Sequence, residues 1–187
     1  MRYLHPYIAS ILTGFVASNG FAGETDEEKI RAALAAAPAK VSSDATVLDW
    51  PATPSDDFRV LRNGSSNWTC LPDMPGDAQY EPSCNDEEWM NWMRAFMKGE
   101  EPKIRRLGVS YMLNSRWALS NTDPTATEPT AGNEWVAGGA HLMIIVPDPA
   151  MLDGYPDDPG PGAYVMWKGT PWVHLMVPME ELVENER

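Results

Sequence analysis

The stretch from Asp86 to Gly99 is the sequence feature that most constrains the fold. At about 100° per residue, its large apolar side chains fall on one arc of roughly 160° around a helix axis. These side chains are Trp89, Met90, Trp92, Met93, Phe96 and Met97. Asn85 or Asp86 can cap its start, and Gly99 suits its end. We therefore predict an amphipathic helix that lays its apolar face on a sheet, rather than a soft-metal site or a partner groove.

The N-terminus has the features of an export signal. Arg2 precedes a short apolar run over 8–17, and small residues follow it where a signal peptidase cuts. We predict a signal peptide over 1–22 and one globular domain over 23–187, secreted or periplasmic. The apolar run is shorter than the roughly 20 residues that cross a bilayer, and no later stretch is longer, so we expect no membrane span.

Export bears directly on the two cysteines. Cys70 and Cys84 are the two cysteines of the chain, and in an oxidising compartment such a pair forms a disulfide. Their spacing is too wide for the redox motif with two intervening residues. We therefore predict a structural disulfide and no free thiol.

The formal net charge of −13 restricts the partners. Such an acidic protein repels nucleic acid and anionic membrane surfaces. We expect a small molecule or an extracytoplasmic protein as the partner, and no nucleic acid.

Alternating and β-branched patterns predict several short strands. The expected strands cover 45–50, 58–62, 68–70, 107–113, 140–146, 163–167 and 172–177. The Asn63-Gly64 pair predicts a hairpin between the second and third of them. The segment 115–139 is rich in turn residues and is expected to be a long surface loop.

Two further helical segments complete the predicted fold. Thr25 and Glu28 have capping-box spacing, which predicts a helix over 23–37 that ends before Pro38. One helical turn is expected over 148–152, and a short acidic helix or frayed tail over 179–186. The predicted fold is a single α+β domain, a mainly antiparallel sheet of five to seven strands packed by the tryptophan- and methionine-rich helix. The alternative is an all-β sandwich with peripheral helices.

A short repeated sequence places histidines and methionines in similar contexts. The string HLMIIVP begins at His141 and HLMVP begins at His174. Because side chains alternate along a strand, Met143 shares a face with His141, and Met176 shares a face with His174. If the strands are neighbours, the histidines lie near one pocket mouth, with imidazoles about 5 Å apart where they oppose each other. Imidazole and thioether ligands together suit copper, and no other cofactor is expected.

Catalysis is the second alternative. His141 or His174 could act as the general base of a hydrolase-like enzyme. The chain has no nucleophile elbow, phosphate-binding glycine loop or metalloprotease helix motif. We leave the enzyme class open and favour a non-catalytic protein that binds a small ligand or a partner.

The candidate ligand-binding residues lie in the C-terminal half. His141 and His174 are joined by Asn121, Asp123 and Trp135 of the turn-rich segment, because loops carry many binding sites and exposed aromatic rings stack on ligands.

Several strings together resemble a group of secreted bacterial proteins labelled hypothetical, of uncharacterised activity. The strings are ATVLDW, LRNGSSNWTCLPD, the WM-x-WM helix, SNTDP, AHLMIIVPDPAML and YVMWKGTPWVHLMVP. The resemblance covers nearly all of the chain after the signal. It implies export and one domain, and it carries over no functional residue.

Overall fold

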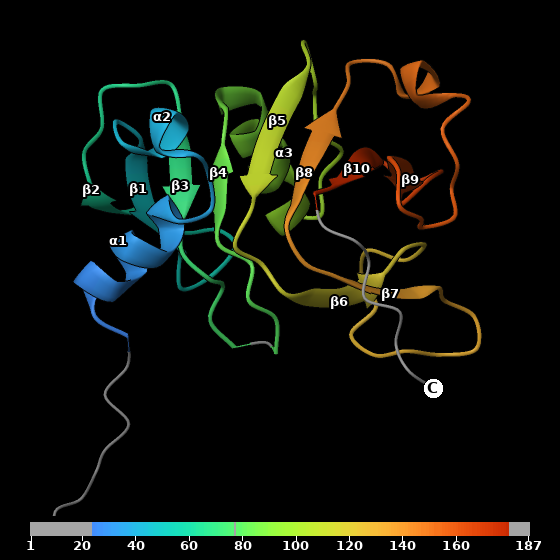
Figure 1. The fold of residues 1–187 in the computed structure, drawn as a ribbon, viewed down its shortest axis with the longest axis horizontal. Helices are drawn as coiled ribbons and strands as arrows, with labels where there is room; N and C mark the ends of the chain where they lie inside the picture. The colour runs from blue at the N-terminus through green and yellow to red at the C-terminus, as the bar shows by residue number, and fades with distance from the viewer. Residues whose placement is uncertain (1–23, 77, 180–187) are drawn as a thin grey trace, which may run out of the picture.

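One large sheet with helices around it forms the computed structural model, which describes residues 24–76 and 78–179 (Figure 1). The predicted signal peptide over 1–22 and the predicted acidic helix or tail beyond Met179 lie outside the described residues. No helix in the described ranges is long and apolar enough to cross a membrane.

The sheet has eight strands in the order β2-β1-β3-β4-β5-β8-β10-β9, and only the described pair β1 and β3 runs parallel. The strands are β1 Thr46–Asp49, β2 Arg59–Arg62, β3 Thr69–Leu71, β4 Ser83–Asn85, β5 Gly108–Met112, β8 His141–Ile145, β9 Tyr164–Met166 and β10 His174–Pro178. The prediction of a mixed helix and sheet fold is confirmed. The predicted strand number was too low because β4 was missed: its sequence Ser-Cys-Asn contains two residues that favour turns over strands.

Two helices near the N-terminus lie over one end of one face of the sheet, in front of β1 and β3 (Figure 1). Helix α1 (Asp26–Leu34) begins with the predicted capping box between Thr25 and Glu28. The four-residue α2 (Ala39–Ser42) follows Pro38 and was not predicted. Buried alanines pack here against β1 and the disulfide, and they are Ala33, Ala36, Ala37 and Ala45.

Helix α3 (Glu87–Met97) lies behind the sheet in Figure 1, on the face opposite α1. The Asp86 side chain accepts a hydrogen bond from the Trp89 N–H at its start, and Gly99 has the positive φ of 65° expected just beyond a helix end. Trp89 and Trp92 are buried in a cluster with Ile145 and Met176 of the sheet. The predicted apolar arc is thus core.

The predicted hairpin at Asn63-Gly64 is wrong. Strand β1 lies between β2 and β3, pairing antiparallel with one and parallel with the other. Gly64 lacks the positive φ that a two-residue hairpin turn requires. It packs on the backbone of 44–46, and the N–H groups of Ser65 and Ser66 donate to the Asp44 carbonyl. Because β2 and β3 lie on either side of β1, the connection between them crosses β1, and this close packing holds the connection in place.

The segment 115–139 is not a structureless loop as predicted. It contains a two-stranded hairpin, β6 (Trp117–Ser120) with β7 (Trp135–Gly138). These four-residue strands are short and contain alanine and glycine, so their pattern is weak. The strands predicted over 163–167 and 172–177 are present as β9 and β10, which pair antiparallel. The predicted helical turn is confirmed as η1 (Pro149–Leu152).

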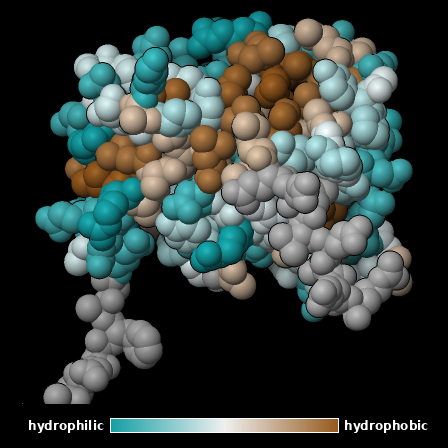
Figure 2. Space-filling view, in the orientation of Figure 1, coloured by the Kyte–Doolittle hydropathy of each residue, from teal (hydrophilic) through white to brown (hydrophobic). Residues whose placement is uncertain are grey.

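The face of the sheet away from α3 is only partly covered. Figure 2 shows hydrophobic residues gathered in the upper part of this view, near β8 and the loop that follows it. Leu152 of η1 packs there on Val165 and Leu175, with Ile144 half-buried beside them. This second core leaves the opposite face of β8 and β10 to the site described below.

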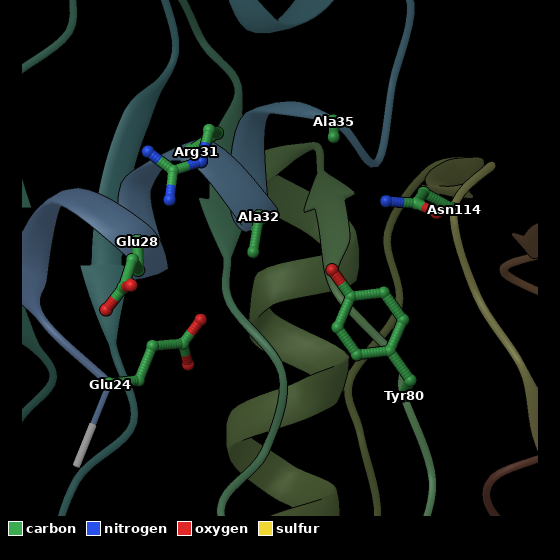
Figure 3. A pocket seen from close by; sticks show the side chains of 7 residues that line it. All are labelled: Glu24, Glu28, Arg31, Ala32, Ala35, Tyr80 and Asn114. Carbon is green, nitrogen blue, oxygen red and sulfur yellow. The ribbon is translucent and has the colours of Figure 1, made fainter. Parts of the chain in front are cut away.

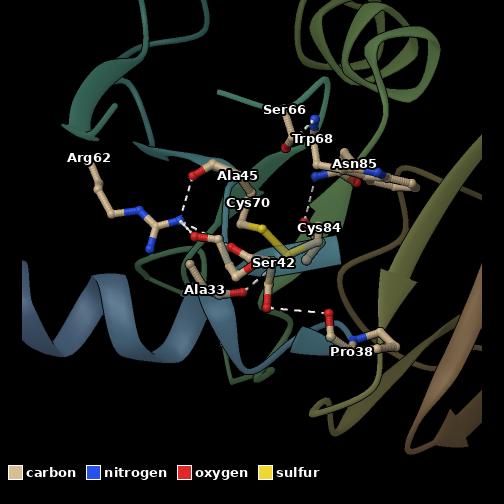
Figure 4. Close-up of a disulfide and its surroundings, with 12 residues drawn as sticks. Ala33, Pro38, Ser42, Ala45, Arg62, Ser66, Trp68, Cys70, Cys84 and Asn85 are labelled. Carbon is tan, nitrogen blue, oxygen red and sulfur yellow. Dashed lines mark hydrogen bonds between the residues drawn. A yellow bond between two sulfur atoms is a disulfide. The ribbon is translucent and has the colours of Figure 1, made fainter. Parts of the chain in front are cut away.

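The predicted disulfide is confirmed, because Cys70 and Cys84 are bonded as directly opposed residues of β3 and β4 (Figure 4). No free cysteine is present. We expect the Cys70→Ala/Cys84→Ala variant to lose about 3 kcal/mol of unfolding free energy, since the bond closes a loop of about 15 residues in the unfolded chain. Urea unfolding with and without reductant checks this, and a variant as stable as the native protein would contradict it.

Candidate functional site

A cavity of about 250 Å³ lies between α3 and the sheet. Five tryptophans line it, namely Trp50, Trp89, Trp92, Trp117 and Trp167. Six methionines also line it, namely Met74, Met93, Met112, Met143, Met166 and Met176. More than half of the tryptophans and methionines of the sequence therefore face one space. We call it the tryptophan–methionine cavity.

Both candidate histidines line this cavity. In the register of β8 and β10, Met143 pairs directly with Met176, while His141 pairs with Pro178. The two histidines therefore share a face but stand four residues apart along the strands, about 13 Å at the usual rise. The expectation that they could oppose each other at about 5 Å is wrong, because the repeated strings align on their methionines.

Each imidazole is fixed through the same local contact. His141 Nδ1 lies 2.8 Å from the Gly139 carbonyl oxygen, and His174 Nδ1 lies 3.0 Å from the Trp172 carbonyl oxygen. We assign the proton of each neutral ring to Nδ1, which donates to that carbonyl. At His141, the Trp117 indole N–H lies 3.2 Å from Nδ1 and 3.2 Å from the Gly139 carbonyl oxygen, and with a proton on Nδ1 it donates to the carbonyl. Neither Nε2 atom has a hydrogen-bond partner in the described ranges, so each Nε2 keeps a free lone pair.

Burial keeps both rings neutral. It lowers the pKa of His141 to about 4, against the hydrogen bond to Gly139, which raises it. Burial lowers the pKa of His174 to about 4 as well, opposed by the hydrogen bond to Trp172 and reinforced by repulsion from His141 when both rings carry a proton. At neutral pH the cavity therefore offers neutral acceptors, with Glu81 as the one acidic residue in its described wall.

Aromatic rings enclose His174. The rings of Trp89, Trp92 and Trp167 meet its imidazole edge to face, with centroids 5.8, 5.8 and 5.0 Å away. Trp167 also stacks on Phe96 at 5.4 Å. His174 is only 1% exposed, so its contacts are made inside the protein.

Trp167 has a strained backbone. Its φ of 57° lies in the left-handed region, which a bulky side chain rarely adopts. The Trp167 N–H donates to the Asn121 carbonyl, and its indole N–H donates to the Ser120 carbonyl at 2.8 Å. Strained residues concentrate at binding and catalytic sites. The Trp167 ring, which follows from this backbone conformation, forms part of the cavity wall.

Some buried polar side-chain atoms lack a hydrogen-bond partner within the described ranges. They are Trp89 Nε1, Trp92 Nε1, Tyr164 OH, Ser110 Oγ, Asn85 Oδ1 and Asn121 Oδ1. Of these residues, Trp89 and Trp92 line the cavity. Buried polar groups normally have a partner, so the two indole N–H groups are unusual for a filled core.

The other predicted binding residues lie outside this cavity. Asn121 Nδ2 donates to Glu134 Oε2 and to the Asp157 carbonyl, which joins two loops. The Asp123 carboxylate accepts two hydrogen bonds from Thr125, which lower its pKa. Trp135 lies half-buried on β7. Ligand binding by these three residues stays a prediction, and neighbouring Leu119 and Pro124 reach the cavity instead.

The geometry around the histidines offers little to a hydrolase. The nearest hydroxyl to His141 is Ser115 Oγ, 3.4 Å from Nδ1. That hydroxyl lies 2.8 Å from the Met112 carbonyl, to which it donates its proton. In the described ranges no carboxylate is hydrogen-bonded to either imidazole. Catalysis by His141 or His174 stays a prediction.

A second hollow lies beside α1 (Figure 3). Glu24, Glu28 and Arg31 surround it from the helix side, with Tyr80 and Asn114 opposite. The Thr25 backbone N–H and hydroxyl donate hydrogen bonds to the Glu28 carboxylate, which lower the pKa of Glu28. Charged side chains of both signs line this wide, open hollow, whereas the tryptophan–methionine cavity is walled mostly by buried groups. We therefore take the cavity as the candidate site.

A metal ion in the cavity would need thioether ligands. In the described part of the chain, no three His, Cys, Asp or Glu side chains lie close enough to hold an ion.

Comparison of the chain with protein-family models, curated proteins and solved structures finds no match.

Proposed function

We propose that this is a secreted or periplasmic protein that binds a small ligand in the tryptophan–methionine cavity without catalysis. The observation that carries the proposal is the cavity itself, a space of about 250 Å³ with rigid aromatic walls and two neutral imidazoles. Ligand sites are commonly concave and mostly apolar, with few polar groups that orient the ligand. The disulfide is compatible with a location outside the cytoplasm.

The unpartnered polar atoms support binding over plain core packing. Trp89 Nε1 and Trp92 Nε1 lack partners and can donate. With Nδ1 of each imidazole donating to a backbone carbonyl, Nε2 can accept. The strained Trp167 keeps its ring at the cavity wall. A ligand that satisfies these groups would recover hydrogen bonds that the protein alone leaves unmade.

Intrinsic fluorescence tests the proposal, because five tryptophans line the cavity. In a screen of small molecules and metal ions, we expect at least one to change the emission saturably. The Leu119→Phe variant, which narrows the cavity, should weaken that ligand at least tenfold. Leu107→Phe, at a position that is 50% exposed and outside the cavity, is the control. Equal affinity in both variants would contradict binding in the cavity.

A further inference from the structure

The repeated HLM strings form a local two-fold arrangement. Strands β8 and β10 are antiparallel neighbours, and Met143 stands directly opposite Met176. Counting two residues back from each methionine along its own strand reaches His141 on one side and His174 on the other. A two-fold axis through the methionine pair therefore relates one histidine to the other.

The flanking strands extend this symmetry. On β5, Met112 stands directly opposite His141, and on β9, Met166 stands directly opposite His174. All these side chains line the same cavity. Two equivalent sets of one histidine and two methionines result, which we call the His141 set and the His174 set. The His141 set adds Met112 and Met143, and the His174 set adds Met166 and Met176.

The spacing within each set suits ligation of one ion. Directly opposed side chains start about 5 Å apart, and residues two apart on one strand start about 7 Å apart. Methionine has three rotatable bonds and adapts its reach. If both histidines bound the same ion, their side chains would have to bridge about 13 Å along the strands. We therefore assign a separate ion to each set.

The two imidazoles share one backbone contact, although only His141 Nδ1 also lies close to Ser115 Oγ, at 3.4 Å, and to Trp117 Nε1, at 3.2 Å. Each Nδ1 is held by the carbonyl two residues earlier, at Gly139 or Trp172. Such a backbone contact orients a metal-binding imidazole and leaves Nε2 as the ligand. An indole meets each ring edge to face, Trp117 on His141 at 5.4 Å and Trp167 on His174 at 5.0 Å.

The donor types select the kind of ion. Thioether sulfur and imidazole nitrogen prefer soft ions such as copper(I), whereas calcium and magnesium require oxygen ligands. Neither set contains a carboxylate, and tryptophan faces attract cations. We propose that the cavity holds two soft monovalent cations of the copper(I) class, one in each set. This rests on the proposed function, because it names the ligand of that same cavity.

Silver(I) is the probe, since it matches copper(I) in charge and softness without redox chemistry at the disulfide. Calorimetry and native mass spectrometry of the unreduced protein should find two silver ions per chain. Two unit charges roughly 10 Å apart in a partly buried site repel enough to weaken the second ion about tenfold. One ion per chain, or none, would overturn the proposal.

Isosteric variants locate the ions. Met112→Leu and Met166→Leu each remove one thioether and keep the core volume, so both should fold. Each should reduce the stoichiometry from two ions to one. Met151→Leu, whose native side chain is 60% exposed and outside the cavity, is the control and should keep two. Two tightly bound ions in both cavity variants would overturn the assignment.

Different results would contradict metal binding and ligand binding in the cavity. If silver does not bind but an organic molecule binds and is weakened by Leu119→Phe, the metal proposal is wrong and the binding function stands. If neither silver nor any screened molecule binds, both are wrong. Silver that binds equally well to the native protein and to the Met112→Leu/Met166→Leu double variant would contradict the two sets.

Discussion

Replacing Trp92 with alanine should lower the free energy of unfolding by about 3–5 kcal/mol, as for other large aromatic truncations in a core. The Trp92 side chain is 4% exposed. Its ring stacks on Trp89 at 5.0 Å and on Phe96 at 5.3 Å. It also meets His174 edge to face at 5.8 Å. The truncation would remove one of the contacts that join α3 to the sheet.

Urea unfolding followed by circular dichroism measures this change. Leu107→Ala is the matched control, because Leu107 is 50% exposed and its truncation should cost far less. An almost unchanged urea midpoint for Trp92→Ala, together with the loss of a partner interaction, would instead identify this helix face as a docking surface.

Acid should destabilise the protein well above the pH at which its carboxylates titrate. An unfolded imidazole takes up a proton near pH 6.5, whereas His141 and His174 stay neutral in the folded protein down to about pH 4. Protonation therefore favours the unfolded chain as the pH falls through this window. Between pH 7.5 and 4.5 we expect a loss of about 2.5 kcal/mol for each histidine.

Unfolding free energies measured by urea across that range test the prediction. His141→Asn keeps a side-chain N–H that can donate to the Gly139 carbonyl, and it removes one titrating group. This variant should lose about half of the pH dependence. Stability that is flat from pH 7.5 to 4.5 in the native protein would show that the imidazoles are already charged or exposed.

The parts of the fold that depend on local patterns could be predicted from the sequence. The α3 helix followed from its apolar arc and caps, and the disulfide followed from export and two cysteines. The order of the strands could not be predicted in this way. The Asn63-Gly64 pair is a strong local hairpin signal, but packing of Gly64 on 44–46 overrides it. Tertiary packing is invisible to a local pattern.

The candidate site was only partly predictable for the same reason. The repeated strings singled out His141, His174 and their methionines, which all line the cavity. Met112 and Met166 were missed because their proximity to the histidines depends on strand register across β5 and β9. The left-handed backbone of Trp167 carries no local sequence signal.

Nuclear magnetic resonance of methionine methyl groups tests most directly whether the tryptophan–methionine cavity is the ligand site. The protein is labelled at methionine methyls and titrated separately with silver(I) and with each molecule selected by fluorescence. The account predicts shifts for cavity methionines such as Met143, Met166 and Met176, and an unchanged signal for the exposed Met151. Shifts confined to Met151, or no shift with any of these probes, would contradict it.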